Sequence, residues 1–409
     1  MSDQTPRKAF AGRAGPGVRS DCGVSFEPRR TGGIEIELKS KVESMYGRVT
    51  RELIGRVLDT LGVSHCRVAV DDQGALPFVI AARLECALLR SGYERSGAFL
   101  PETGPGFGAR TEKFRMRRSR LYLPGNEPKF FMNAGLHGPD GVILDLEDSV
   151  ALSEKDAARI VVRNALRVVD FGRAERMVRI NQFPAGLDDL EWIIPHNVHV
   201  VLIPKCESAA QVTAIDERIV AIAKRENVEY PVYLMPIMES ALGAIRAFEV
   251  ASASPNVVSL AVGLEDYTAD IGTQRTLEGR ESFWARAQVV NAARAAGVQP
   301  IDTVFSDVAD MEGLRASVVE AKELGFEGKG CIHPRQIAVV HEAFAPAGVE
   351  VEKAVRIVRA FDKAEAAGLG VVSLGTKMID PPVVKRALRT VELAEKVGRL
   401  SAGWREEKE

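Results

Sequence analysis

The sequence predicts an α/β protein: a TIM, or (β/α)8, barrel with a C-terminal helical extension, preceded by a small α+β domain. Short apolar runs alternate with longer helical stretches such as SEKDAARIVVRNALRVV along the second part of the chain. Eight such alternations over about 220 residues are what a barrel of this kind requires. The runs are RLYLPG, GVILDLED, MVRIN, VHVVLIPK, VYLMPIME, VVSLAVGLED, QPIDTV and GKGCIHP.

The front of the chain has a different pattern. GIEIELK alternates apolar and polar residues, which predicts a strand with Ile34, Ile36 and Leu38 on one face. A helical period follows and stops at Gly62; HCRVAV then predicts a second strand, and ALPFVIAARLECALLR a second helix. This α+β domain carries no catalytic constellation of its own.

Shifts in composition suggest the domain boundaries. Residues 93–116 are rich in Gly, Pro and Arg, which is typical of a linker. We expect a disordered tail at 1–20, the α+β domain at 21–92, the linker at 93–116, the barrel at 117–345 and the helical extension at 346–409.

Composition and charge exclude several classes of function. The chain has 409 residues, of which 46% are hydrophobic and 27% charged, with a formal net charge of −2. Nothing in this balance points to nucleic acid or an anionic membrane as a partner. No apolar run approaches the roughly 20 residues that span a bilayer. The five scattered cysteines fit reduced thiols, so we expect a cytoplasmic protein.

Polar side chains follow nearly every barrel strand. Active sites of such barrels lie at the C-terminal ends of the strands, so these groups are expected to converge on one mouth. They are Asp145, Glu147, Asp148, Arg179, Asn181, Lys205, Glu239, Glu265, Asp266, Asp302 and His333.

Glu239 and Asp266 follow the fifth and sixth strands, which are neighbours in a barrel. Two adjacent carboxylates without cysteine or clustered histidine suit a hard cation, Mg²⁺ above all. A single strand-end acid is more often a helix cap, but a pair that faces an arginine and a lysine favours the metal. Arg179 can hold a substrate carboxylate or a developing enolate oxygen. Its structural alternative is an ion pair with Glu147 or Asp148.

Other polar residues have structural explanations. Ser153 and Asp156 have the spacing of a capping box. His333 stands alone before a proline, where a structural role is the more common one. Asp380 precedes two prolines and an amphipathic helix, which is typical of an N-cap, although a catalytic role stays open.

The motifs RSRLYLPGN, DLEDSV, VRIN, LIPKCES, MPIMES, GLEDYTADIG, IDTVFSD, GKGCIHPRQI and SLGTKMIDPPVVKRA occur in order over roughly residues 115–400. Together they resemble the citrate lyase β-subunit and the HpcH/HpaI aldolase family, which includes malyl- and citramalyl-CoA lyases. GIEIELKSKVESMYG and VAVDDQGALPFVIAARLECALLR in the front domain resemble the citrate lyase acyl carrier protein, the γ-subunit.

The resemblance implies a Mg²⁺-dependent lyase that cleaves a β-hydroxyacyl thioester, such as a citryl thioester, into a keto acid and an acetyl thioester. By motif, Glu239 and Asp266 would hold the metal, and Arg179 would steady the carboxylate or enolate. Asp380 matches an acid that reaches in from a neighbouring subunit and protonates the enolate carbon.

The same resemblance implies further substrate-binding residues. Arg118 and the segment around Lys129 match the region that meets the nucleotide-like arm of the thioester, and Glu147, Asp148 and Lys205 belong to the predicted mouth. It also implies a homotrimer or homohexamer, and a citrate lyase α-subunit-like acyltransferase as a further partner.

The carrier family attaches a phosphopantetheine-type arm to a serine ahead of the first strands. Counted back from Pro28, that position falls on Arg19, with Ser20 one place later. The substrate therefore rides either on Ser20 or on free CoA. A malyl-CoA or citramalyl-CoA lyase, and a non-catalytic carrier or scaffold subunit, stay open as alternatives.

Overall fold

A computed structural model describes residues 7–366, 372–374 and 377–405. The chain forms two compact units, Met1–Ile337 and Ala338–Glu409, which are described separately. Among the described residues, no helix combines the length and the apolar character needed to span a membrane.

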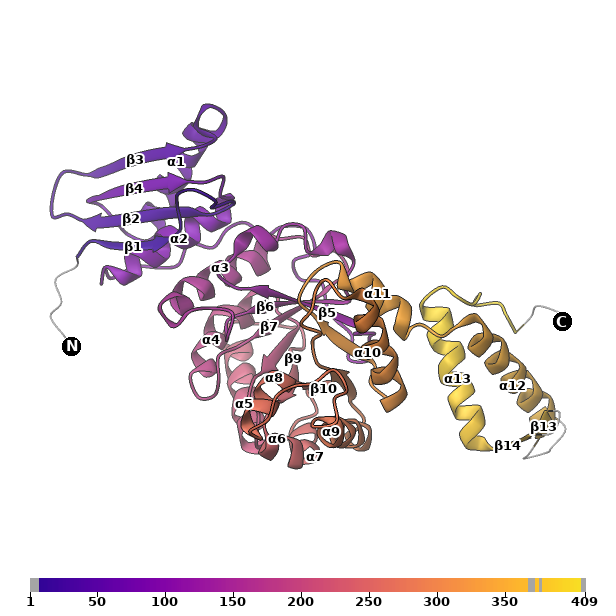
Figure 1. Cartoon of the computed structure of the whole chain (residues 1–409). Helices are drawn as coiled ribbons and strands as arrows, with labels where there is room; N and C mark the ends of the chain where they lie inside the picture. Colours follow the sequence, from indigo (N-terminus) through magenta and orange to yellow (C-terminus); the bar gives the residue numbers. More distant parts are fainter. Residues whose placement is uncertain (1–6, 367–371, 375–376, 406–409) are drawn as a thin grey trace. The chain divides into compact units, whose positions relative to one another are not determined.

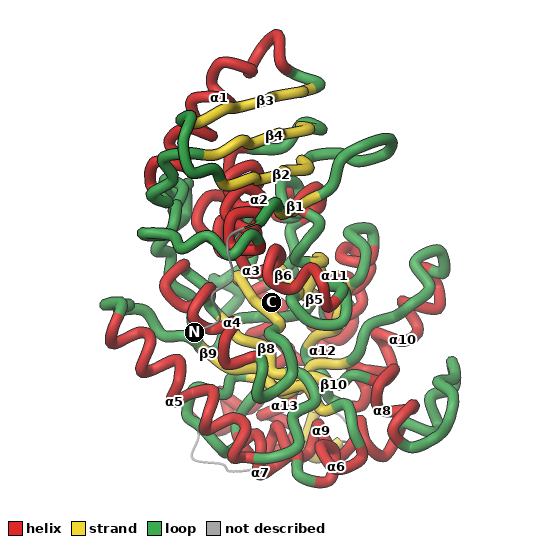
Figure 2. Tube along the Cα trace, turned by 90° about the vertical axis from the view of Figure 1, so that its left-hand side faces the viewer, coloured by secondary structure: helices red, strands yellow, loops and turns green. Residues whose placement is uncertain are grey.

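The first unit begins with a four-stranded sheet in the order β1-β2-β4-β3, with β3 and β4 parallel and the other pairs antiparallel. Figure 2 shows these strands side by side. The elements are β1 (Ala9–Gly12), β2 (Cys22–Pro28), β3 (Ile34–Ser40), α1 (Glu43–Thr60), β4 (Cys66–Asp72) and α2 (Pro77–Arg90).

The sequence predicted β3, β4 and both helices, but not the first two strands. The expected disordered tail at 1–20 is wrong for Ala9–Gly12, which pairs with β2; residues 1–6 lie outside the described part. In β2, Cys22, Val24 and Phe26 are fully buried and alternate, so the strand signal was present.

Helix α2 is buried along nearly its whole length because it packs between this sheet and helix α3 (Lys155–Val168) of the barrel. Glu85 of α2 accepts hydrogen bonds of 3.1 and 2.7 Å from the Arg163 guanidinium, and neither side chain is exposed. Asn164 donates to the Phe78 carbonyl at 3.0 Å. Ion-paired and amide contacts therefore join the small domain to the barrel.

The capping box expected at Ser153 and Asp156 is wrong, because Asp156 takes part in this contact between the domains. Helix α3 starts at Lys155 with Glu154 as its N-cap, and no side chain caps it. Asp156 instead accepts two hydrogen bonds, of 2.8 and 2.7 Å, from Arg90 of α2. The acid that sequence spacing assigned to a helix start serves the domain contact.

Eight parallel strands close into a barrel in the order β10-β11-β12-β5-β6-β7-β8-β9 (Figure 1), which confirms the predicted fold. Its interior is filled by a cluster that includes Ile143, Met177, Leu202 and Ile237. The strands are β5 (Ser119–Pro124), β6 (Gly141–Asp145), β7 (Glu175–Arg179), β8 (Val200–Ile203), β9 (Tyr233–Met238), β10 (Ser259–Val262), β11 (Gln299–Asp302) and β12 (Gly328–Cys331).

Helices surround these strands (Figure 1). Besides α3 they are α4 (Gly186–Ile193), α5 (Ala209–Arg225), α6 (Ala241–Ile245), α7 (Ala247–Ala251), α8 (Leu264–Asp270), α9 (Phe283–Ala296) and α10 (Met311–Leu324). Helix α11 (Gln336–Phe344) begins at the end of the first unit and continues into the second. Short 3-10 turns are η1 (Pro128–Phe130), η2 (Gly135–His137), η3 (Leu152–Glu154) and η4 (Ile194–His196).

The segment expected to be a linker has no regular structure but is held against the barrel. Gly104 donates from its backbone to Arg167 at 2.8 Å, and the Thr111 hydroxyl donates to Glu175. Glu175 also pairs with the buried Arg117 at 2.6 Å. Residues 93–116 therefore connect the two domains through fixed contacts.

The second unit contains α12 (Gly348–Ala366), α13 (Pro381–Lys396) and the hairpin strands β13 (Val372–Leu374) and β14 (Lys377–Ile379). Trp404 and apolar residues of α12 and α13 form its core. Asp380 is the N-cap of α13, and its side chain accepts a hydrogen bond of 3.2 Å from the Val383 backbone. The N-cap position that the sequence allowed for Asp380 is therefore present, and the catalytic role of this residue stays a prediction.

Candidate active site

The C-terminal ends of the barrel strands surround a cavity of about 360 Å³. It brings together many of the residues predicted from strand ends. Those that line it are Asp145, Asp148, Arg179, Glu239, Glu265, Asp266 and Asp302.

Arg179, at the end of β7, is held by two acids. Its Nε and Nη2 donate to the two oxygens of Asp145, both at 2.7 Å, and its Nη1 lies 3.0 Å from Glu147 Oε2. The guanidinium also lies over the ring of Tyr122, 5.4 Å from its centroid. The ion pair with Glu147 that the sequence left open is therefore present, and it fixes the direction of an arginine at the mouth.

The two acids differ in their proton affinity. Burial raises the pKa of Asp145, but its hydrogen bonds and ion pair with Arg179 outweigh burial and hold that pKa below its usual value. Burial also raises the pKa of Glu147, and Arg179 offsets this only in part, so the pKa of Glu147 stays above its usual value. Asp145 is thus the permanent counter-charge of Arg179, while Glu147 is the more readily protonated of the two.

Glu239 follows β9 and is only 5% exposed. Gly263 makes room for it, because a Cβ at that position would lie 2.4 Å from Glu239 Oε2. The Lys205 backbone has a φ of 46°, and its N–H donates to Glu239 Oε1 at 2.6 Å. A non-glycine residue in this conformation is strained, a cost commonly found at functional sites. Two backbone features therefore fix the Glu239 carboxylate.

Asp266 lies in the first turn of α8, four residues beyond the end of β10, and lines the same cavity. Lys205 Nζ is 3.0 Å from Asp266 Oδ1, with both side chains about one-third exposed. Glu265 points elsewhere, toward an ion pair of 2.6 Å with Arg275. Of the two consecutive acids, Asp266 is the one that accompanies Glu239.

The donor set suits a hard divalent cation. Burial raises the pKa of Glu239 to about 8, and the negative charge of Asp266 adds to the rise. A cation between the two carboxylates would relieve both effects. No group of three His, Cys, Asp or Glu side chains with metal-binding geometry occurs among the described residues. A cation held here would take its remaining ligands from water and substrate, which is the usual arrangement for Mg²⁺.

Several predicted residues lie outside this mouth or are already paired. Arg118 precedes β5, at the opposite end of the barrel, and forms a bidentate pair with Asp140 at 2.8 and 2.9 Å. Arg118 therefore lies roughly 20 Å, the length of six strand residues, from the mouth, and its expected contact with the nucleotide-like arm of the thioester stays a prediction. His333 accepts a local hydrogen bond from the Arg335 backbone at 3.2 Å. Asn181 donates to Asp189 at 2.8 Å.

Asp302 also has a structural environment. Its carboxylate accepts from Lys329 at 2.7 Å and from Arg286 at 3.1 Å, and the three side chains are buried. Burial raises the pKa of Asp302, but the two cations outweigh it and lower that pKa. Asp302 lines the cavity, but its carboxylate is engaged by these two cations.

Sequence reasoning missed two residues of the cavity, Arg120 and Tyr122, which point into the barrel from β5. The strand was treated as a buried run, and its alternation gave no reason to single them out. An arginine at the start of such a run was nevertheless a usable signal, because arginine is almost never fully buried without a partner.

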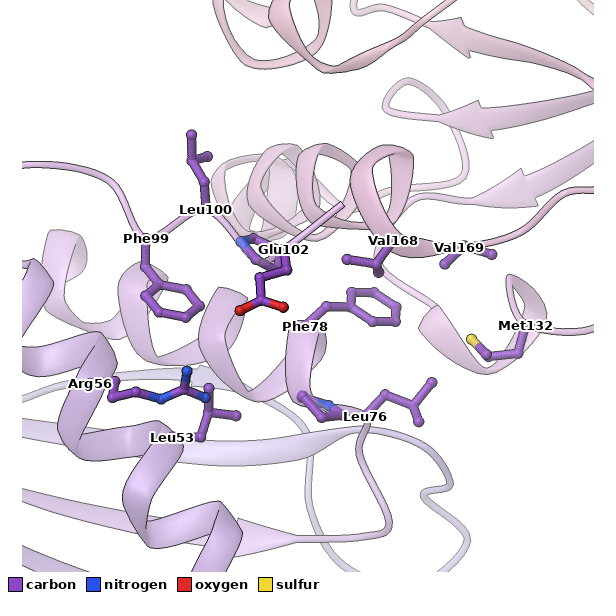
Figure 3. A pocket seen from close by; sticks show the side chains of 12 residues that line it. Leu53, Arg56, Leu76, Phe78, Phe99, Leu100, Glu102, Met132, Val168 and Val169 are labelled. Atoms are coloured by element: carbon purple, nitrogen blue, oxygen red, sulfur yellow. The ribbon is translucent and has the colours of Figure 1, made fainter. Parts of the chain in front are cut away.

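A second cavity, of about 500 Å³, lies between the small domain, the linker and the end of α3 (Figure 3). Its walls are mainly apolar, with Phe78, Phe99 and Val168 among them, and Arg56 and Glu102 are its charged members. Although larger, it lacks the convergent acids and arginine of the mouth. We therefore place the chemistry at the mouth.

The proposed attachment residue lies in the small domain. Ser20 has a φ of 55°, is partly buried, and donates from its backbone to the Gln73 carbonyl at 3.2 Å. The neighbouring Arg19 side chain is exposed. Ser20 thus occupies an ordered turn ahead of β2.

A (β/α)8 barrel with two acids and a fixed arginine at its mouth has the groups that an aldolase-type lyase requires. Residues 118–334 match the family described as HpcH/HpaI aldolase/citrate lyase. Residues 8–91 match the ACP family described as malonate decarboxylase delta subunit. The chain belongs to the HpcH/HpaI aldolase/citrate lyase family, and both resemblances stated from its sequence are confirmed.

Relatives support this assignment. Citrate lyase subunit beta of Leuconostoc mesenteroides is 40% identical over 285 residues, covering 68% of this chain and 94% of the relative. Human mitochondrial citramalyl-CoA lyase is 33% identical, covering 70% and 87%. The structure of CitE from Mycobacterium tuberculosis in complex with magnesium, acetoacetate and coenzyme A is 31% identical, with a TM-score of 0.57, covering 68% of this chain and 98% of that one.

Proposed function

We propose that the chain is a Mg²⁺-dependent lyase that converts a citryl thioester into oxaloacetate and an acetyl thioester. The observation that carries the proposal is the cavity in which Glu239 and Asp266 face Arg179. Identity favours this substrate, since the citrate lyase relative is 40% identical and the citramalyl-CoA lyase relative 33%. A malyl-CoA or citramalyl-CoA lyase is the alternative within the same chemistry.

The reaction breaks the bond between the hydroxyl-bearing carbon and the carbon next to the thioester carbonyl. The hydroxyl loses its proton to a base, its carbon becomes the keto carbon, and the electron pair passes to the acetyl thioester as an enolate. Protonation of the enolate carbon completes the reaction. A Mg²⁺ ion held by Glu239 and Asp266 would supply a Lewis acid for the oxygens of the keto-acid half.

The residues of this chain supply positioning and charge. Arg179, whose direction is set by Asp145 and Glu147, offers a fixed guanidinium to a carboxylate or enolate oxygen. Asp148 and Lys205 bring a carboxylate and an ammonium group to the same entrance. Asp380 of a neighbouring chain is proposed as the acid that protonates the enolate carbon, in a homotrimer or homohexamer.

The proposal also covers the small N-terminal domain and the partners of the chain. The substrate reaches the barrel as a free CoA thioester, with Ser20 mostly unmodified, and an acyltransferase resembling the citrate lyase α-subunit is a candidate partner in the cytoplasm. A carrier or scaffold without turnover is disfavoured, because Glu239, Asp266, Arg179 and Asp380 are all present.

The metal assignment is tested by Glu239→Gln and Asp266→Asn, which keep side-chain size and remove charge. Each variant is expected to lose lyase activity at least 100-fold and to lose Mg²⁺ binding in calorimetry, with thermal unfolding within a few degrees of wild type. The exposed Glu265→Gln serves as the matched control. Full activity in either variant, or in EDTA-treated protein, would contradict the proposal.

A further inference from the structure

Arg120 of β5 is a buried cation on the floor of the catalytic cavity. It lies two residues before Tyr122 on the strand, so both side chains point into the barrel, and both line the cavity beside Arg179 and Glu239. Only 1% of Arg120 is exposed. The proposed reaction gives this residue no task.

The guanidinium of Arg120 has poor partners within the protein. Nη1 lies 2.9 Å from the thioether sulfur of Met235, and Nη2 lies 3.5 Å from the Asp302 carbonyl oxygen. Nε has no hydrogen-bond partner. The nearby Asp302 carboxylate is engaged by Lys329 and Arg286.

The other fully buried arginines are different. Each of them forms a hydrogen-bonded ion pair with a buried acid: Arg83 with Asp21, Arg117 with Glu175 and Arg163 with Glu85. Within the described part of the chain, no such ion pair is found for Arg120. Arg176, which is 3% exposed, also has no acid partner among the described residues, but it donates to the Gly106 carbonyl at 2.8 Å and does not line the cavity. Arg120 differs from it because its guanidinium lacks an acid partner and the residue lines the catalytic cavity.

An unpaired buried charge is costly, since the loss of hydration is not repaid by a counter-ion. Arginine keeps its charge in proteins, so it cannot escape the cost by losing its proton. A guanidinium that opens onto a cavity and lacks an internal acid is arranged to receive an anion from outside. Its planar fork suits a carboxylate.

We propose that Arg120 binds the second carboxylate of the keto-acid half and so selects citryl thioesters; this inference rests on the proposed function. Oxaloacetate carries one carboxylate beside its keto group and another at the far end. Pyruvate and glyoxylate, released from citramalyl and malyl thioesters, carry only the first. The metal acids and Arg179 serve the keto-acid end common to all three, and Arg120 serves the group that only oxaloacetate has.

The test compares two substrates in wild-type protein and Arg120→Met, which keeps a long side chain without charge. The ratio of kcat/KM for citryl-CoA to that for citramalyl-CoA is expected to fall on the order of 10- to 100-fold, as for the loss of a hydrogen bond to a charged group. Arg294→Met, which removes an exposed ion pair with Glu327 on the outside of the barrel, should leave the ratio unchanged. An unchanged ratio in Arg120→Met would overturn the proposal.

Two measurements that do not depend on catalysis test the role of Arg120 independently of the lyase assignment. In calorimetry on the full chain, wild type should bind oxaloacetate more tightly than pyruvate, and Arg120→Met should lose the preference. Without ligand, Arg120→Met should melt no lower than wild type, because an unpaired buried charge is removed. Equal affinity of wild type for the two keto acids, or a large drop in melting temperature, would assign Arg120 a structural role. A wild type that cleaves neither thioester but prefers oxaloacetate would refute only the lyase assignment.

Discussion

The proton held by Glu239 should make Mg²⁺ binding pH-dependent in a way that identifies this residue. In the metal-free protein, burial, with a smaller contribution from Asp266, raises the pKa of Glu239 from 4.5 to about 8. A divalent cation needs the carboxylate form. Below pH 8, binding must therefore displace a proton.

The size of the effect follows from this pKa. At pH 7, a group with a pKa of about 8 is roughly 90% protonated, so about 0.9 proton should be released for each Mg²⁺ bound. The apparent affinity should rise nearly tenfold between pH 6 and pH 7 and level off above pH 8.

The stability of the metal-free protein should change with pH in the opposite direction to its Mg²⁺ affinity. Between pH 4.5 and 8 the folded state binds more protons than the unfolded chain, because its Glu239 is still protonated. The free energy of unfolding should therefore fall as the pH rises through this window, by at most about 5 kcal/mol from this group. Saturating Mg²⁺ should remove most of the decline.

The assay is calorimetric titration of Mg²⁺ at pH 7 in two buffers of different ionisation enthalpy, repeated from pH 6 to pH 8.5. Glu239→Gln is the control, since it has no proton to release and should bind the metal weakly. Wild-type binding without proton release, together with an affinity that does not change between pH 6 and pH 8, would refute the reasoning.

Three further results are expected. Glu85→Ala leaves the buried Arg163 without this partner, so the free energy of unfolding in denaturant should fall by about 3–5 kcal/mol. Glu52→Ala, which removes an exposed ion pair, should lower it by less than about 1 kcal/mol. Equal losses in the two variants would contradict a fixed contact between the domains. Asp380→Ala and Glu239→Ala proteins, each inactive alone, should regain partial activity when co-assembled, and clean mixing without recovery would place Asp380 outside a shared site. Intact-mass measurement from the native host should find the chain unmodified, and a stoichiometric adduct on Ser20 would make the small domain a working carrier.

The sequence was sufficient for the barrel because each of its strands is buried on both faces and stands between helical stretches. All eight strands were found this way. The missed strand β1 is only four residues long, and its AFAG sequence has too few residues to show a period. The domain contact was also hidden, since nothing local indicates that Asp156 pairs with Arg90, which lies 66 residues earlier.

The candidate site was predictable to the extent that it depends on strand ends. This rule brought Asp145, Arg179 and Glu239 to one cavity. It could not show how each side chain turns, so Asp302 was included although its carboxylate faces Lys329. Arg118 was predicted to bind substrate only from the family resemblance, and the structure places it before β5, at the other end of the barrel.

The most direct test of the account is the product that purified protein forms from citryl-, malyl- and citramalyl-CoA in the presence of Mg²⁺. The account predicts oxaloacetate and acetyl-CoA in equal amounts from citryl-CoA, with the highest kcat/KM of the three, and no turnover after EDTA treatment. A higher kcat/KM for malyl- or citramalyl-CoA, or turnover of citryl-CoA without metal, would contradict it.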